Sequence, residues 1–195
     1  MTTLYTPEVR AKLEDYLATH DLPSGLGDES SACSVAAINL ALTGELTDDI
    51  PDCMSKVLGS ATIALQDLMP HEMRNSDRYK AWLPTAAGTG RDHEQERLAV
   101  LMDWMWGTVL PHLQGLADEK GFGQEWREMC EQRTESVAAK AVAANAAAAA
   151  VAAEAAASAT YAASAAYDAY ADRVGFWDAV DPIGVLERMT KIGED

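Results

Sequence analysis

The chain has 195 residues and 48% hydrophobic content, enough to bury a core as one domain with an appendage. Its formal charge is −16 and its predicted pI is near 4.5. This charge argues against direct nucleic-acid binding, because phosphates are bound by Lys and Arg. Three scattered cysteines are too few for a disulfide framework or a zinc site. We therefore expect no metal and no cofactor.

The N-terminal sequence MTTLYTPEVRAKLEDYL lacks the basic and apolar blocks of a signal peptide. The chain also has no run of eighteen large apolar residues, which a membrane-spanning helix needs. We expect a cytoplasmic protein that does not enter the membrane.

The first predicted helix runs from Pro7 to about His20, with Thr6 as its capping residue and proline at its first position. Apolar residues then predict a buried helix over 31–42, which Gly44 ends.

Asp49 or Asp52, on either side of Pro51, is expected to open a third helix that runs to Met69. Ser76 is expected to cap a short fourth helix through Trp82. The sequence PTAAGTGRD then predicts a loop.

A fifth helix is predicted over 92–109. The apolar residues of this helix recur at helical spacing and are expected to face inward. They are Leu98, Leu101, Met102, Met105 and Val109.

The most unusual segment is Val137–Asp172, where 22 of 36 residues are alanine and none is Pro or Gly. Alanine is the strongest helix former, so this segment predicts part of one long helix. Asp181 and Pro182 then predict the start of a short terminal helix. No alternation predicts a strand.

The expected fold is therefore all-α. A compact helical body over 1–120 is followed by a long alanine-rich helix over 121–175 and a short C-terminal helix over 176–195.

An acidic belt is the first candidate interaction surface. Between Glu14 and Glu72 eleven acidic residues face a single base, Lys56. Asp48, Asp49 and Asp52 are its densest group, and they suit a basic protein partner. The alternative is a solvated acidic face that serves solubility.

The alanine-rich segment is the second candidate surface. Projected on a helix, Val142, Tyr167 and Tyr170 lie together amid alanines such as Ala149 and Ala156. Small side chains let two helices approach closely, so this face favours a homo-oligomer. Packing of the segment against its own body is the alternative.

A third polar group consists of Asp92, His93 and Glu96, with Asp103 on the same predicted helix. A histidine beside carboxylates can act as a general base or a metal ligand. The group lacks the His-Glu-x-x-His pattern, however, and surface ion pairs at a helix start explain it equally well. We expect no catalytic residue here.

The segments SACSVAAINLALTGELTDDIPDCMS and LPTAAGTGRDHEQERLAVLMDWMWGTVLP, with the alanine-rich tail, resemble a group of uncharacterised helical proteins from environmental bacterial and phage sequences. The resemblance covers residues 7 to 170. It implies a phage-related protein but no activity and no functional residues.

The sequence thus favours a non-enzymatic interaction or self-assembly protein that uses the alanine-rich helix as a packing surface. The alternative is an acidic inhibitor from a phage or mobile element, which mimics nucleic-acid charge and binds a basic protein cleft. An enzyme that uses Asp92, His93 and Glu96 is the third hypothesis.

Overall fold

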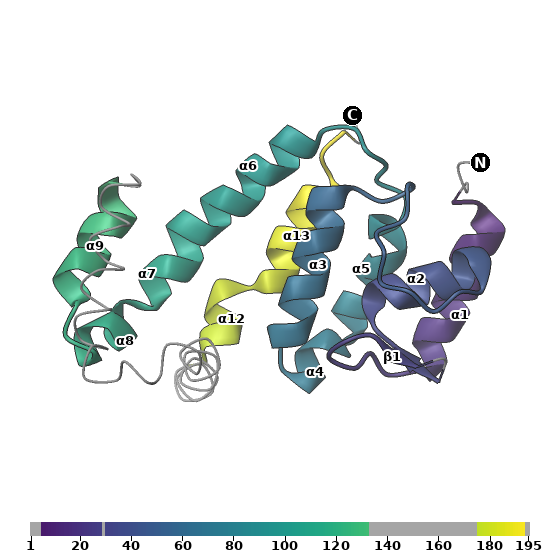
Figure 1. The fold of residues 1–195 in the computed structure, drawn as a ribbon, viewed down its shortest axis with the longest axis horizontal. Helices are drawn as coiled ribbons and strands as arrows, with labels where there is room; N and C mark the ends of the chain where they lie inside the picture. Colours follow the sequence, from purple (N-terminus) through teal and green to yellow (C-terminus); the bar gives the residue numbers. More distant parts are fainter. Residues whose placement is uncertain (1–4, 29, 133–174, 194–195) are drawn as a thin grey trace. The chain divides into compact units, whose positions relative to one another are not determined.

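The computed structural model describes residues 5–28, 30–132 and 175–193 (Figure 1). Within these ranges the chain is all-α, as predicted, and its C-terminal helix is short. The segment Val137–Asp172 lies outside the described residues, so the long alanine-rich helix stays a prediction.

Contacts between Cα atoms divide the chain into two compact units. The first unit combines residues 1–101 with 182–195, and the second covers 102–181. The C-terminal helix therefore belongs to the same unit as the N-terminus. The expected boundary at residue 120 stays a prediction, because most of the segment that it sets apart lies outside the described residues.

The first unit is built from helices and one small sheet. The helices are α1 (Pro7–Thr19), α2 (Ser34–Thr43), α3 (Lys56–Leu68), α4 (His71–Arg74), α5 (Asp77–Ala86), most of α6 (Glu94–Trp104), and α13 (Pro182–Thr190). Strands β1 (Gly27–Asp28) and β2 (Ser31–Ala32) pair antiparallel. These strands are too short for sequence alternation to indicate them.

Local capping signals place several helix ends as predicted. Thr6 accepts a hydrogen bond from the Val9 amide at 3.4 Å, and Ser76 accepts one from Tyr79 at 3.3 Å. Gly44 ends α2 in the left-handed conformation, with φ 78°. These positions are confirmed because each signal lies next to the helix end that it caps.

The predicted cap of the third helix is wrong. Helix α3 begins at Lys56, and its cap is Ser55, whose hydroxyl accepts from the Leu58 amide at 3.1 Å. Asp49 and Asp52 lie earlier, in a loop. Their carboxylates contact Thr47 and Arg91 instead of a helix end.

The core of the first unit centres on α2, which packs against α1 and α3. Val35 and Ile38 are fully buried. The buried Ser34 is satisfied as well, because its amide donates to Gln66 at 2.7 Å and its hydroxyl lies 2.9 Å from that of Tyr79. Such pairing is what a buried polar group needs.

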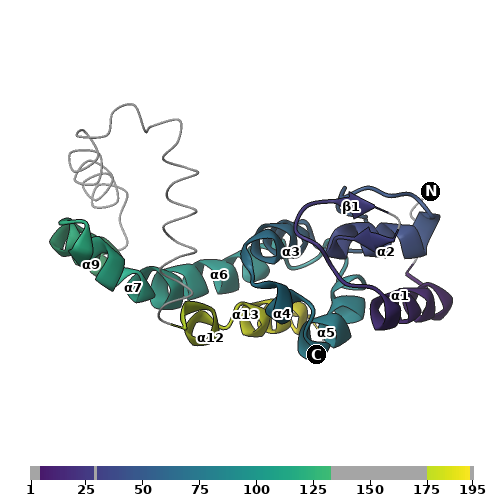
Figure 2. The ribbon, with the colours of Figure 1, turned by 90° about the horizontal axis from the view of Figure 1, so that it is seen from below.

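Helix α13 packs beside α3 and α5, as Figures 1 and 2 show. The Trp82 indole donates to the Thr190 hydroxyl at 2.8 Å. The Arg78 guanidinium forms two hydrogen bonds to the Glu187 carboxylate, at 2.9 and 2.7 Å. The C-terminal helix is thus joined to α5 by both buried and exposed polar contacts.

Helix α6 departs from its predicted inward face. Leu98 and Met102 are 39% and 44% exposed, whereas the charged Arg97 of the same helix is only 2% exposed. Val109 is buried as predicted. The apolar spacing was misleading because Arg97 finds buried hydrogen-bond acceptors that a sequence pattern does not reveal.

The second unit contains the end of α6, the π-helical segment η1 (Met105–Val109), α7 (Leu110–His112), α8 (Gln114–Glu119), α9 (Gly123–Gln132) and α12 (Phe176–Val180). The indoles of two of its tryptophans donate hydrogen bonds to backbone carbonyls. The Trp104 indole donates to the Val180 carbonyl at 2.6 Å, and that of Trp126 to Leu110 at 2.8 Å. Met129 packs among half-buried residues of this unit, including Trp106.

None of the helices in the described ranges combines the length with the apolar character that crossing a membrane requires.

Candidate functional site

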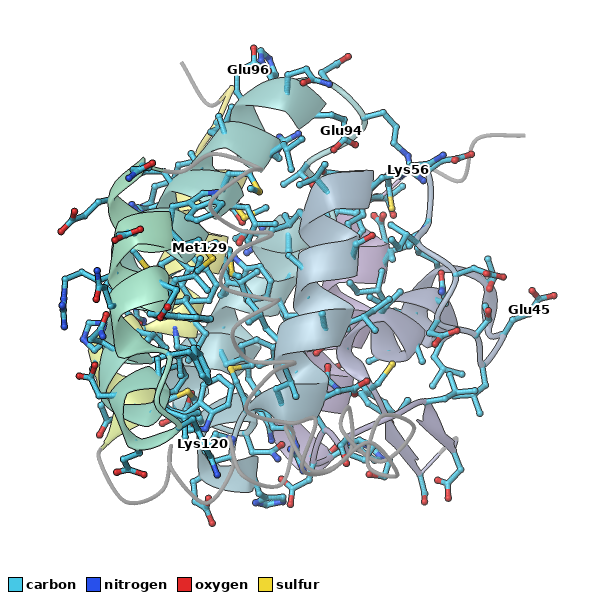
Figure 3. All side chains as sticks on the ribbon, turned by 60° about the vertical axis from the view of Figure 1, so that its left-hand side comes forward. Glu45, Lys56, Glu94, Glu96, Lys120 and Met129 are labelled. Carbon is cyan, nitrogen blue, oxygen red and sulfur yellow. The ribbon has the colours of Figure 1, made fainter. Side chains whose placement is uncertain are left out.

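The acidic loop, residues 44–55, connects α2 to α3 and carries four carboxylates and no basic residue. All four are exposed: Glu45, Asp48, Asp49 and Asp52. Figure 3 shows the Glu45 side chain pointing away from the ribbon. Three of the sequence-predicted interaction residues therefore lie together on one exposed loop.

The backbone of the acidic loop is held from inside by a buried amide. Asn39 of α2, only 5% exposed, donates hydrogen bonds to the carbonyls of Thr47 at 2.7 Å and Asp49 at 2.8 Å. A single buried amide group therefore fixes two points of the loop. Because the buried amide of Asn39 is costly to leave without its acceptors, these bonds resist loop rearrangement.

Further contacts hold the second half of the loop. The Arg91 guanidinium donates to the carbonyls of Ile50 at 3.0 Å and Pro51 at 3.2 Å. Ile50 also lies against Gly59 of α3, where an added Cβ would come within 2.6 Å of its side chain. The close approach requires glycine at position 59. The loop is thus irregular in conformation but anchored along its length.

The carboxylates of the acidic loop are mostly left without cations. Asp52 lies 3.4 Å from Arg91, and Asp49 accepts a bond from the Thr47 hydroxyl at 3.1 Å. Glu45, Asp48 and Asp49 form no ion pair with any of the described residues. Their negative charge therefore faces solvent.

The wider acidic belt is exposed too. Ten of its eleven acids lie in the described ranges, and each of the ten is exposed; Glu29 lies outside those ranges. Some have local partners, as Glu14 does with Arg10 at 2.8 Å and Asp21 with Lys80 at 3.4 Å. The acidic loop differs in having three carboxylates within five residues, Glu45, Asp48 and Asp49, that form no ion pair with a described residue.

The Asp92, His93 and Glu96 group forms a loose surface arrangement. The His93 ring lies 3.4 Å from a Glu96 carboxylate oxygen, and both side chains are about half exposed (47% and 59%). His93 has φ 61°, and its ring covers Gly193, where a Cβ would approach within 2.8 Å. Asp103 belongs to the second unit.

Glu94 lies between His93 and Glu96 in the sequence, but its carboxylate caps the start of α3. Its carboxylate accepts hydrogen bonds from the Ser55 hydroxyl at 2.7 Å and from the amides of Lys56 at 2.7 Å and Val57 at 3.0 Å. Figure 3 shows Glu94 beside the start of α3 and Lys56. The negative group thus occupies the positive end of the helix dipole.

These contacts shift the acidity of Glu94. Burial acts to raise its pKa, but the hydrogen bonds from the Ser55 hydroxyl and two amides outweigh burial and lower the pKa below its ordinary value. Sequence reasoning missed this cap because Glu94 lies 38 residues after Lys56. No local signal links the two positions.

Polar groups of the Gly88-Thr89-Gly90 loop form hydrogen bonds with other residues of the chain. The Gly90 amide donates to the Cys53 carbonyl at 2.8 Å, and the Thr89 hydroxyl accepts from the Ser55 amide at 3.0 Å. These bonds join the loop to the end of the acidic loop.

Both Cys53 and the buried Cys33 have pKa values raised by burial, which disfavours a reactive thiolate.

The other predicted interaction residues, Val142, Ala149, Ala156, Tyr167 and Tyr170, lie outside the described residues. Within the described ranges no three His, Cys, Asp or Glu side chains are grouped to hold a metal ion.

No protein-family model matches the chain, and neither the curated proteins nor the solved structures provide a match.

Proposed function

We propose that the protein is a non-enzymatic interaction protein and that its acidic loop binds a basic protein partner. One observation supports this proposal. Glu45, Asp48 and Asp49 are exposed and form no ion pair with any described residue, while the loop backbone beneath them is anchored by buried Asn39.

An anchored loop favours binding for a physical reason. Ordering a mobile segment costs free energy on association, and a segment that is already fixed avoids that cost. Exposed carboxylates of one sign also speed the encounter with a basic surface. The same arrangement suits an inhibitor that presents carboxylates where nucleic acid would present phosphates.

Affinity capture from lysate at two salt concentrations tests the proposal. We expect a basic partner that is retained at low salt and released above about 0.3 M salt, where separated charges are strongly screened. Added duplex DNA should displace a partner that normally binds nucleic acid. Captured proteins that are not basic, or that stay bound at high salt, would contradict the proposal.

Self-association through the alanine-rich segment is a second proposal, supported by its 22 alanines in 36 residues. We expect a homo-oligomer in light scattering at tens of micromolar protein. Ala149→Glu and Ala156→Glu should reduce the mass, because charged side chains prevent close helix packing. A strict monomer, or a mass unchanged by both substitutions, would refute it.

A further inference from the structure

A polar hollow of about 300 Å³ lies in the first unit, between the N-terminal residues, α5 and the end of α13. We call it the arginine hollow. Ten described residues line it: Tyr5, Arg10, Pro84, Thr85, Gly88, Thr89, Arg97, Thr190, Ile192 and Gly193. Two of these are arginines and none is acidic.

Its charge sets it apart from two neighbouring hollows of the same unit. One, of about 410 Å³, is lined by Glu14 and Asp77 with Lys80. The other, of about 500 Å³, includes the ion-paired Arg78 and Glu187. In a chain of net charge −16, a hollow whose described lining carries only positive charge is unexpected.

Arg97 is the buried part of that charge. Its guanidinium donates to the carbonyls of Met189 at 3.1 Å, Thr89 at 3.3 Å and Ile192 at 3.2 Å, and to that of Asp92. These four bonds leave one of its five N–H groups, on Nη1, unassigned. No carboxylate among the described residues forms an ion pair with it. The charge of Arg97 is felt by Glu94 and Glu96, whose pKa values it helps to lower, but neither carboxylate forms a direct ion pair with its guanidinium. A buried cation without a direct ion pair can still attract an anion.

Arg10 supplies a second cation at the mouth of the hollow. Its Nε bonds to Glu14 at 2.8 Å, and its side chain is 46% exposed. The two terminal nitrogens of its guanidinium form no hydrogen bond with a described residue. They remain available for a bidentate contact with an oxyanion.

Tyr5 closes one side of the hollow without adding negative charge. Its hydroxyl donates to the Pro84 carbonyl at 2.8 Å, and its ring lies over Gly88, where a Cβ would approach within 3.3 Å. Burial raises the pKa of Tyr5 to about 12, so the phenol stays neutral near pH 7.

We propose that the arginine hollow binds the phosphate or carboxylate group of a small molecule, with Arg10 as its direct contact and buried Arg97 as the fixed charge behind it. The volume is at the lower end of the range of ligand pockets, which fits a small metabolite. This inference does not rest on the proposed function, because the acidic loop contributes no residue to the hollow.

Calorimetric titration of the full chain tests it, with inorganic phosphate and succinate as separate probes and sodium chloride at matched ionic strength as the reference. We expect saturable binding of at least one oxyanion at a single site. Phosphate alone would identify a phosphate site, and succinate alone a carboxylate site. If neither phosphate nor succinate bound more tightly than chloride, the proposal would be overturned.

Two exposed bases of α1 provide a matched pair of variants. Arg10→Gln should weaken binding about tenfold, since it removes charge-assisted hydrogen bonds. Lys12→Gln removes the same charge from an exposed position of the same helix that does not line the hollow, and should leave the affinity nearly unchanged. Equal weakening by both would show a general charge effect and refute the site.

Thr85→Leu keeps every charge but fills part of the hollow. Thr85 is half-buried, and its hydroxyl donates a hydrogen bond within α5, to the Trp82 carbonyl at 2.6 Å. We expect the variant to fold, as its thermal unfolding would show, and to lose oxyanion binding. Unchanged affinity in a folded Thr85→Leu protein would place the anion elsewhere and contradict the proposal.

Discussion

The acidic loop and the arginine hollow belong to the same unit and use arginine in opposite ways. At the loop, Arg91 holds the carbonyls of Ile50 and Pro51, and the exposed carboxylates point to solvent. At the hollow, Arg97 is itself buried and holds the end of α13. At the loop, the arginine orders a backbone segment whose exposed side chains are negative. At the hollow, the buried arginine also holds backbone carbonyls, but it supplies the positive charge of the site itself.

The difference teaches that net charge does not describe a protein surface. Charges that hold backbone groups contribute to stability, whereas unpaired exposed charges contribute to binding. Substitutions in the two regions should therefore separate stability from affinity.

The largest expected effect is that of Arg97→Ala. It removes four hydrogen bonds to carbonyls and should lower the free energy of unfolding by about 3–5 kcal/mol. Urea unfolding measures the loss. Arg188→Ala, at an exposed position of α13, is the matched control and should change stability by less than about 0.5 kcal/mol. Similar small losses in both would show that Arg97 does not hold the C-terminal helix.

Asn39→Ala should come next, with a loss of about 2 kcal/mol, because two loop carbonyls lose their donor. Hydrogen exchange should also speed up in residues 44–55. Asn39→Asp keeps the size of the side chain but not the donor, so we expect a similar change. Unaltered exchange in both variants would mean that the loop is not anchored from α2.

Glu94→Gln tests the long-range cap of α3 and should cost about 1 kcal/mol at neutral pH. The folded-state pKa of Glu94 is lowered, so its contribution is present above the unfolded-state pKa and is lost as pH falls through the folded-state value. The stability difference between Glu94→Gln and the wild type should therefore shrink between about pH 7 and about pH 3.

Glu96→Gln is the control for that experiment. Glu96 is exposed and caps no other helix; its own backbone amide and His93 lower its pKa. We expect a smaller effect on unfolding than that of Glu94→Gln. A larger effect of Glu96→Gln would show that the contacts between Glu94 and the start of α3 do not stabilise the protein.

The parts of the fold that the sequence predicted correctly depend on neighbouring residues. Thr6, Gly44 and Ser76 act within one turn of the helices that they begin or end. The exposed Asp48 and Asp49 were found in the same way, because a run of acids without bases indicates a charged surface.

The parts that were missed depend on residues far apart in the chain. Ser55 was overlooked as a cap, and its partner Glu94 is 39 residues away. Arg97 reaches carbonyls more than 90 residues later in the chain. Helical spacing alone cannot distinguish such a buried arginine from an exposed one. The spacing therefore predicted that Leu98 faces inward, whereas the buried residue is Arg97.

The most direct test of the proposed binding surface measures the dissociation constant of the captured basic partner for three proteins. These are the wild type, the loop variant Glu45→Gln/Asp48→Asn/Asp49→Asn/Asp52→Asn, and a control that loses four exposed acids elsewhere, Asp15→Asn/Glu72→Gln/Glu119→Gln/Glu131→Gln. Both variants lose the same charge. We predict that the loop variant binds at least about tenfold more weakly and with less salt dependence, while the control stays close to the wild type. Equal weakening in both variants, or none in the loop variant, would contradict binding through the acidic loop.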